Sequence, residues 1–309
     1  MMKNKISVII PTYNEEKRIE TCLKSIPSSF DEVIVFDKGS TDNTLEIISR
    51  YKLIKVISIP FSNRGKENPL MIFPYARNEW VLIITASEIL SENIFNKVNQ
   101  TINQNPEIEL IMVPREMYVF QTYFIGSPWG IQYYPFCFQK SKIKFSENVH
   151  ELFYIENEEK KLFLPPIKET LVKHITHNSF NKYFSHIEDY IENEFEKYKD
   201  TSDAIQKCKD QILLYEGLFK SNSVNKTIHF AAWSIYWNSI ILRLLESKYN
   251  LNFEKTDYNE FIDFLENKKD YTHKLIKPSN FIIIYLKKLY RKYYSINWLR
   301  LIKAKLIKT

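Results

Sequence analysis

The sequence predicts an α/β protein with a doubly wound, mostly parallel sheet, followed by a helical region. Between Ser7 and Ile48 the chain twice reads as an apolar strand, a short polar turn and an amphipathic helix. This is the pattern of a βαβ nucleotide-binding half, whose ligands bind at the carboxyl ends of the strands. Beyond residue 181 the apolar residues recur with helical spacing to the end of the chain.

The first half of the chain supplies the predicted strands. The run Val8-Ile9-Ile10 within residues 5–11 is typical of a strand that is buried on both faces. The helices after the first two turns are expected to begin at Asn14 and at Ser40 or Thr41, because these residue types cap helices. Further strands are predicted at 32–36, 54–57, 80–84 and 108–113.

The rest of the chain divides into a β-rich and a helical part. Residues 115–180 are aromatic and carry no long helical period. Helices are predicted at 182–199, 202–221, 226–248, 257–267 and 280–305.

Two domains are expected from this pattern. One is an α/β domain over 1–185, with a nucleotide half at about 1–113 and a second half at about 114–185. The other is a helical region over 186–309 that ends in a basic tail.

Composition excludes several classes of protein. A hydrophobic fraction of 44% and only 5 glycines among 309 residues exclude a disordered or linker-rich chain. The cysteines form no Cys-x-x-Cys pair, which predicts a reducing compartment and no zinc site. The longest apolar run near the end, at 281–286, is far shorter than the roughly 20 residues that span a bilayer. With no signal peptide before the first strand, we expect a cytoplasmic protein, soluble or peripheral on the inner face of the plasma membrane.

The tail at 274–309 concentrates positive charge. It holds ten Lys or Arg and no Asp or Glu, interleaved with aromatic residues. One interpretation is a helix on an anionic membrane surface. The other is a helical cap with a solvated basic face. Nucleic acid is not an expected partner, because no nucleic-acid motif accompanies the charge.

The first two turns resemble the family 2 glycosyltransferases of the GT-A fold. A further element, Val-His-Glu at 149–151, resembles the subgroup of lipopolysaccharide-core β-glucosyltransferases. The matching runs are Val8-Ile9-Ile10-Pro11-Thr12-Tyr13-Asn14-Glu15-Glu16, Val35-Phe36-Asp37 with Gly39-Ser40-Thr41-Asp42, Trp80-Val81-Leu82, Val149-His150-Glu151 and His177-Asn178-Ser179-Phe180. The resemblance covers roughly residues 5–185 and implies a nucleotide-sugar donor and a glycan or glycolipid acceptor, with the half at about 114–185 as the acceptor half.

The donor site implied by this resemblance lies at the turns. Tyr13 would stack on the base, Asp37 would accept hydrogen bonds from the base or ribose, and the backbone near Thr12 would pair with the base edge. The alternative for Asp37 is that its carboxylate only caps the next turn. The full set of predicted donor-binding residues is Pro11, Thr12, Tyr13, Glu15, Asp37, Lys66 and Ser87.

The fourth strand departs from the family pattern. The family has Asp-x-Asp there, which holds Mg²⁺ or Mn²⁺ on the diphosphate, but this chain reads Thr85-Ala86-Ser87-Glu88. Hydroxyls are poor ligands for these cations, so we predict weak metal dependence, with Glu88 and His150 as the candidate ligands. The diphosphate charge would then be met by cationic side chains; the candidates are Arg64, Lys66, Arg77 and Arg115.

The catalytic residues implied by the resemblance are Glu151 and Glu88. An inverting transfer needs a carboxylate that takes the proton of the acceptor hydroxyl, for which Glu151 is the first choice and Glu116 a further candidate. Trp129, His150 and His177 are predicted on the acceptor or phosphate side. Each has a structural alternative: a packed aromatic core for Trp129 with Tyr133, Tyr134 and Phe136, and structural hydrogen bonding for His150, His174 and His177.

The sequence thus predicts an inverting glycosyltransferase that acts on a cell-surface glycan such as a lipopolysaccharide or lipooligosaccharide core. The alternative is a non-catalytic relative that has lost its metal motif and keeps the site for binding. A nucleotidyltransferase of similar topology is disfavoured, because the chain does not begin with a glycine-rich activating loop.

Overall fold

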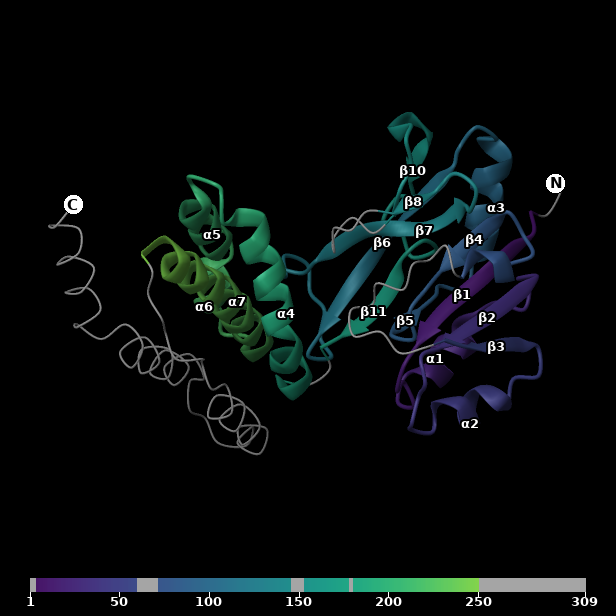
Figure 1. Ribbon diagram of the computed structural model, residues 1–309, viewed down its shortest axis with the longest axis horizontal. Coiled ribbons are helices and arrows are strands. Elements are labelled where there is room, and N and C mark those ends of the chain that lie inside the picture. The colour runs from purple at the N-terminus through teal and green to yellow at the C-terminus, as the bar shows by residue number, and fades with distance from the viewer. Residues whose placement is uncertain (1–3, 60–71, 146–152, 178–179, 250–309) are drawn as a thin grey trace, which may run out of the picture. The chain divides into compact units, whose positions relative to one another are not determined.

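A computed structural model describes residues 4–59, 72–145, 153–177 and 180–249 (Figure 1). Contacts between Cα atoms divide the chain into two compact units. Unit 1 comprises Met1–Ile125 with Trp129–Asn178, and unit 2 comprises Gly126–Pro128 with Ser179–Thr309. The domain boundary predicted at residue 185 stays a prediction; in the structure it falls inside helix α4 (Phe180–Tyr198).

A nine-stranded sheet forms the centre of the described part of unit 1. Two further short strands, β8 (Lys144–Phe145) and β9 (Phe153–Tyr154), pair only with each other. Along the main sheet the order is β3 (Ile54–Ser58), β2 (Glu32–Asp37), β1 (Ile6–Thr12), β4 (Trp80–Ile83), β7 (Ile131–Gln139), β6 (Leu110–Val119), β11 (Val172–Thr176) and β5 (Glu88–Ile89), with β10 (Lys161–Phe163) on β6.

The interior strands are apolar because helices or further chain cover both faces. Val8 and Ile10 of β1 face a core cluster that takes side chains from α1 (Ile19–Ser25), α2 (Thr44–Ser49) and α3 (Ile94–Gln104). Ile9 faces the opposite way, into a cluster that includes Phe73 of the 3₁₀ turn η2 (Phe73–Tyr75). The run Val8-Ile9-Ile10 is fully buried, as the sequence predicts.

The direction of each strand decides which of the turns after the strands lie at the same edge of the sheet. Strands β2 and β4 run parallel to β1, and β3 runs parallel to β2. Strand β7 is antiparallel to both β4 and β6, so β6 and its parallel neighbour β11 point the same way as β1. The carboxyl ends of β1, β2, β4, β6 and β11 therefore lie along one edge of the sheet, which we call the carboxyl edge. The predicted fold class, an α/β GT-A sheet that is mostly parallel, is confirmed.

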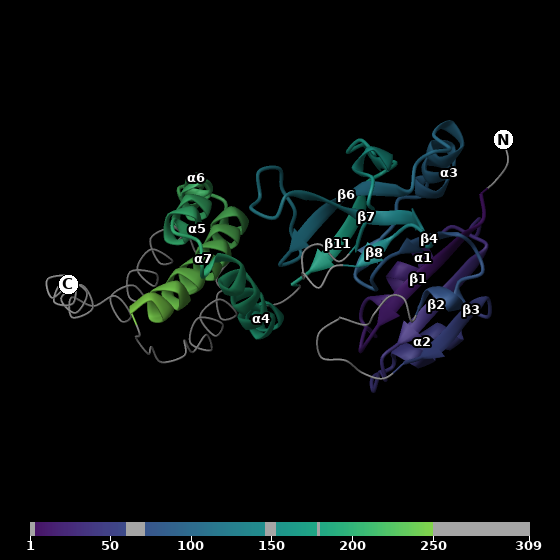
Figure 2. The same cartoon turned by 45° about the horizontal axis from the view of Figure 1, so that its top comes forward.

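Unit 2 is helical over its described residues. Helices α4, α5 (Ala204–Leu213) and α6 (Glu216–Phe219) each contact the long helix α7 (Val224–Tyr249), as Figure 2 shows. The contact side of α7 is aromatic, with Trp233 and Trp237 stacked edge to face. Among the described helices, none combines the length and the apolar character that crossing a bilayer requires. The predicted helices at 257–267 and 280–305 and the basic tail lie outside the described residues.

Candidate functional site

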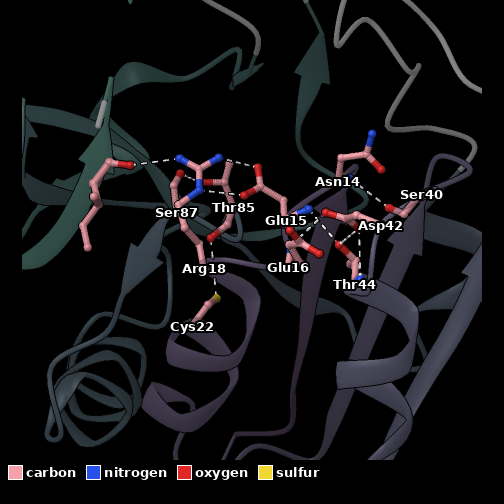
Figure 3. Close-up of polar contacts among 11 residues, drawn as sticks. Asn14, Glu15, Glu16, Arg18, Cys22, Ser40, Asp42, Thr44, Thr85 and Ser87 are labelled. Atoms are coloured by element: carbon pink, nitrogen blue, oxygen red, sulfur yellow. Dashed lines mark hydrogen bonds and ion pairs between the residues drawn. The ribbon is translucent and has the colours of Figure 1, made fainter. Parts of the chain in front are cut away.

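Asn14 joins the first two turns of the carboxyl edge. It adopts a left-handed backbone conformation (φ 51°), which asparagine tolerates better than most residues. Its backbone N–H donates to Ser40 Oγ at 2.9 Å, and its side-chain oxygen accepts from the Thr41 N–H at 2.8 Å. The turn after β1 is therefore fixed to the turn after β2, rather than capping its own helix (Figure 3).

A second set of bonds ties the same turns together. The Glu15 N–H donates to Thr44 Oγ1 at 2.7 Å, and the Glu16 N–H donates to Asp42 Oδ2 at 3.1 Å. Burial works against the ionised form of Asp42, but hydrogen bonds from the Thr44 hydroxyl and N–H outweigh it and lower the pKa of Asp42. Asp42 is thus held as a carboxylate that orders both turns. Such cross-linking fixes backbone groups in place before any ligand binds.

Asp37, a predicted donor-binding residue, ends β2 and is 1% exposed. Its carboxylate accepts from the N–H groups of Gly39 and Ser40, each at 3.0 Å, and from Ser40 Oγ at 2.5 Å. Gly39 has a φ of +82°, which a side chain would strain. These contacts are those of a turn cap, the alternative that the sequence leaves open for Asp37.

The end of β4 carries a pair of hydroxyls. Thr85 Oγ1 and Ser87 Oγ lie 2.7 Å apart, at the positions where the family pattern has two aspartates. The Thr85 carbonyl accepts a contact from Cys22 Sγ on α1 at 3.5 Å, and the Ser87 carbonyl accepts from the Ile175 N–H of β11 at 2.8 Å. The segment is therefore held from both sides, at the middle of the carboxyl edge.

Glu88, the remaining carboxylate of this segment, points inward and is completely buried. One of its oxygens lies 2.5 Å from Arg115 Nη2 and 3.3 Å from His174 Nδ1. Its other oxygen accepts from the Thr85 N–H at 2.8 Å. Both partners come from neighbouring strands, because Arg115 lies on β6 and His174 is paired with Glu88 across β5 and β11.

Electrostatics keep this cluster as an ion pair with a neutral histidine. Burial opposes ionisation of Glu88, but the positive charge of Arg115 and the contact from His174 prevail and lower the pKa of Glu88. Burial also lowers the pKa of His174, and the charges of Arg115 and Arg18 act in the same direction. The Arg115 guanidinium lies 3.4 Å from the centre of the Tyr134 ring. Glu88 therefore has its charge balanced inside the protein.

This donor set does not fit a divalent cation. Two hydroxyls are poor ligands for Mg²⁺ or Mn²⁺, and the Glu88 carboxylate is buried against Arg115. Within the described ranges, no group of three or more His, Cys, Asp or Glu side chains is placed to hold a metal ion. The same burial argues against Glu88 as a general base, since the acceptor hydroxyl would have to reach it.

Other predicted residues also lie at the carboxyl edge. Pro11 and Thr12 end β1, and Tyr13 follows them with 39% of its surface exposed. His177 follows β11 with a left-handed φ of 45°, and its carbonyl accepts from the N–H of Phe120, just after β6. Trp129 precedes β7, whose antiparallel direction brings its beginning to the same edge. Strand direction thus gathers residues that are far apart in the sequence.

The aromatic residues of β7 differ in how far they are exposed. Phe136 is buried in the core, and Tyr134 is partly buried against it, under the Arg115 guanidinium. Tyr133 is 39% exposed and donates its hydroxyl to the Leu164 carbonyl. For Tyr134 and Phe136 the packed-core alternative is the one that the geometry supports.

Several predicted residues are not described by the structure. Glu151, His150 and Lys66 lie outside the described residues, as does Arg64. Glu116 is described; it lies on β6 and accepts a long hydrogen bond of 3.4 Å from the Tyr118 hydroxyl. Glu151 as base and Lys66 as a donor contact stay predictions.

The sequence analysis missed Arg18. Its guanidinium forms a two-point ion pair with Glu15, with Nε–Oε2 at 2.6 Å and Nη2–Oε1 at 2.5 Å, and Nη1 donates to the Ile175 carbonyl at 3.1 Å. The pair has a sequence signal, an acid and a base three residues apart beside the first turn. The contact with β11 has none, because it depends on the fold.

Comparison with known proteins shows what the N-terminal part of the chain resembles. The family model described as glycosyl transferase family 2 matches residues 7–157, which include the turns, the hydroxyl pair and Glu88. Residues 7–157 are therefore similar to the family 2 glycosyltransferases. The matched segment also contains His150 and Glu151.

Relatives and solved structures carry related names. The SPbeta prophage-derived glycosyltransferase SunS of Bacillus subtilis is 29% identical over 151 residues, which are 46% of this chain and 33% of that protein. The poly(ribitol-phosphate) β-N-acetylglucosaminyltransferase TarS of Staphylococcus aureus is 34% identical over 28% of this chain and 17% of that protein. A solved mannosyltransferase of Pyrobaculum calidifontis, in complex with GDP-mannose and Mn²⁺, has a TM-score of 0.47 and 13% identity, over 81% of this chain and 89% of that one. The matches with the two curated relatives thus span a third or less of those proteins.

Proposed function

We propose that this protein transfers one sugar from a nucleotide-diphosphate sugar to a hydroxyl of a cell-surface glycan, with inversion at the anomeric carbon. The acceptor oxygen forms a bond to the anomeric carbon while the bond from that carbon to the β-phosphate oxygen breaks. The bonding pair leaves with the nucleoside diphosphate, and a carboxylate takes the proton of the acceptor hydroxyl.

The observation that carries the proposal is the cross-linked pair of turns within the segment that matches family 2. Asn14, Glu15 and Glu16 are bonded to the turn after β2, so the backbone beside Thr12 and Tyr13 is fixed at the carboxyl edge. A fixed edge of this kind binds nucleotides in doubly wound sheets. Tyr13 is exposed there and offers a ring for the base.

The acceptor class rests on the names of relatives and on the sequence. TarS and a relative from Bacillus spizizenii are named as poly(ribitol-phosphate) β-glycosyltransferases, and the Val-His-Glu element resembles lipopolysaccharide-core enzymes. We propose a cell-surface glycan or glycolipid, with a lipopolysaccharide or lipooligosaccharide core as the first candidate. The β-linkage in both relatives' names agrees with inversion, since common nucleotide sugars are α-linked.

Glu151 remains the proposed base. It lies inside the family match, and Glu88 is buried in an ion pair. His150 and His177 are proposed on the phosphate side, and Trp129 on the acceptor side. The variant Glu151→Gln keeps the size of the side chain and removes the base, so kcat should fall while nucleotide affinity persists.

The basic tail is proposed to hold the protein at an anionic membrane surface on its cytoplasmic side. Each basic residue near such a surface contributes about 1 kcal/mol, which salt screens. Binding to anionic but not to neutral vesicles, lost at high salt, would support this placement.

A donor screen tests the proposed function. A panel of UDP-, GDP- and dTDP-sugars is added to the full chain in EDTA and in Mn²⁺, and the thermal midpoint is followed. A donor that binds only the native state raises the midpoint with concentration, and product release with a glycan acceptor then tests transfer. If no nucleotide sugar stabilises the chain, the proposed function fails; if one binds without transfer to any acceptor, the non-catalytic alternative gains.

A further inference from the structure

We propose that Arg18 binds the diphosphate of the donor in the place that a divalent cation takes in relatives with an Asp-x-Asp motif. The inference rests on the proposed function for the identity of the ligand, a diphosphate. It assigns this role to a residue that lies outside the motifs of the sequence analysis, and it explains how the hydroxyl pair at Thr85 and Ser87 operates without metal.

The negative charge of the diphosphate favours a cationic side chain near the end of β4. An Asp-x-Asp pair contributes two negative charges, which a bound dication cancels. Replacing both aspartates with Thr85 and Ser87 removes the two charges and the reason for the dication together. The diphosphate itself still carries negative charge that must be met in the site, and arginine is well suited to phosphate because its donors form a planar fork.

Arg115 is not available for this role. Its guanidinium lies between the completely buried Glu88, at 2.5 Å, and the ring of Tyr134. Removing its charge from Glu88 would leave a carboxylate buried and unpaired, which is costly. Arg115 therefore balances the interior and not a ligand.

Strand direction excludes a second candidate. Arg77 bonds to Glu32, the first residue of β2, at 3.1 Å. The beginning of β2 lies at the amino edge of the parallel strands, opposite the turns that hold the proposed donor. Arg50 is on the surface of α2 in an ion pair with Glu46.

Arg18 lies beside the hydroxyl pair. Ile175 links them, because its carbonyl accepts from Arg18 Nη1 and its N–H donates to the Ser87 carbonyl. One helical turn after Arg18, Cys22 contacts the Thr85 carbonyl. Figure 3 shows Arg18, Thr85 and Ser87 in the same part of the carboxyl edge.

The contacts of Arg18 orient its guanidinium and use only some of its N–H donors. A guanidinium has five N–H donors. Within the described part of the chain, two are used by Glu15 and one by the Ile175 carbonyl. The remaining two are left for a phosphate. Glu15 is then a positioning residue: its two-point contact holds the plane of the guanidinium, and its own side chain is only 17% exposed.

The test uses inorganic pyrophosphate, so that the identity of the base does not matter. Isothermal titration of the full chain in EDTA should show binding. Arg18→Gln should weaken that binding at least tenfold, as expected for the loss of charge-assisted hydrogen bonds. Arg18→Lys keeps the charge but loses the fork, and should lie between the two.

Arg50→Gln is the matched control, because it also breaks an Arg–Glu pair, here at the exposed C-terminal end of α2. It should bind pyrophosphate as the parent does. Far-ultraviolet circular dichroism and the thermal midpoint establish that each variant is folded. If Arg18→Gln does not fold, the Arg18→Lys titration decides, and unchanged affinity there overturns the inference.

Two further results would overturn the inference: pyrophosphate binding that requires Mn²⁺ or Mg²⁺, or equal affinity of the parent and Arg18→Gln in EDTA. Neither touches the proposed function, which fails instead if no nucleotide sugar stabilises the parent chain under either condition. Loss of binding in Arg18→Gln but not in Arg50→Gln supports the assignment of Arg18.

Discussion

Two parts of the carboxyl edge use acidic side chains in opposite ways. At the turns after β1 and β2, Glu15, Glu16 and Asp42 lie near the surface and order backbone N–H groups or an arginine. At the end of β4, Glu88 is turned inward and neutralised by Arg115. The first set of carboxylates fixes exposed turns to each other, whereas Glu88 is paired inside the protein. A strand end that lacks exposed carboxylates can thus be ordered by a buried ion pair.

The largest effect should come from breaking the internal pair. Glu88→Gln should leave Arg115 buried and uncompensated, which typically costs about 3–5 kcal/mol of unfolding free energy. Chemical denaturation of the parent and the variant measures this difference in unfolding free energy. The matched control is Glu46→Gln, which breaks the exposed pair with Arg50 and should cost no more than about 1 kcal/mol.

Replacement of both Glu88 and Arg115 tests whether the cost comes from an unpaired buried charge. Glu88→Gln with Arg115→Met removes both charges and should recover part of the loss, because no buried charge is left alone. Equal costs for Glu88→Gln and Glu46→Gln would contradict the view that Glu88 is an interior charge.

Asp37 should show the next largest effect, on stability and on nucleotide binding together. Asp37→Ala removes the acceptor for two N–H groups and a hydroxyl, and should cost about 1.5–3 kcal/mol. The same loosening of the turn should abolish stabilisation by a nucleotide sugar. Glu32→Gln, at the opposite edge of the sheet, is the control and should leave donor binding unchanged. Undiminished donor affinity in Asp37→Ala would remove that turn from the binding site.

Tyr13 should affect binding without affecting the fold. Its ring is 39% exposed, and base stacking on an aromatic ring contributes about 1–3 kcal/mol in nucleic-acid complexes. Tyr13→Ala should therefore weaken nucleotide affinity by about tenfold or more in a calorimetric titration, while Tyr13→Phe keeps it. Similar affinities for the two variants would place the base elsewhere.

His174 should produce the smallest effect, a dependence of stability on pH. Burial holds the pKa of His174 below its usual 6.5. The charges of Arg115 and Arg18 also lower this pKa, whereas the contact with Glu88 raises it. The unfolded chain therefore binds a proton more readily than the folded one, so stability falls as the pH drops below about 6.5. His174→Gln should flatten this part of the stability profile. A profile that the variant leaves unchanged would show that His174 titrates normally.

Much of the fold follows from local patterns in the sequence. The buried run in β1 and the order of strands and helices are visible because both depend on neighbouring residues. The helix caps predicted at Asn14 and at Ser40 or Thr41 are wrong: α1 begins at Ile19 and α2 at Thr44. A polar residue after a strand can bond to its own helix or to the next turn, and here the left-handed backbone of Asn14 selects the next turn.

The candidate site was harder to predict. The sequence shows that carboxylates are missing at Thr85 and Ser87, but not where Glu88 points. Its partners Arg115 and His174 come from strands β6 and β11, which are brought beside it only by the order of the sheet. The contact of Arg18 with the Ile175 carbonyl depends on the same strand order.

Restoring the family motif tests the central claim most directly, namely that this edge binds a nucleotide diphosphate without a divalent cation. The affinity of the best donor from the screen is measured by titration for the parent and for the double variant Thr85→Asp/Ser87→Asp, each in EDTA and in Mn²⁺. The parent should bind equally well in both, whereas the double variant should bind poorly in EDTA and recover in Mn²⁺, because two added carboxylates repel the diphosphate until a cation bridges them. Parent binding that vanishes in EDTA and returns with Mn²⁺ would contradict the account.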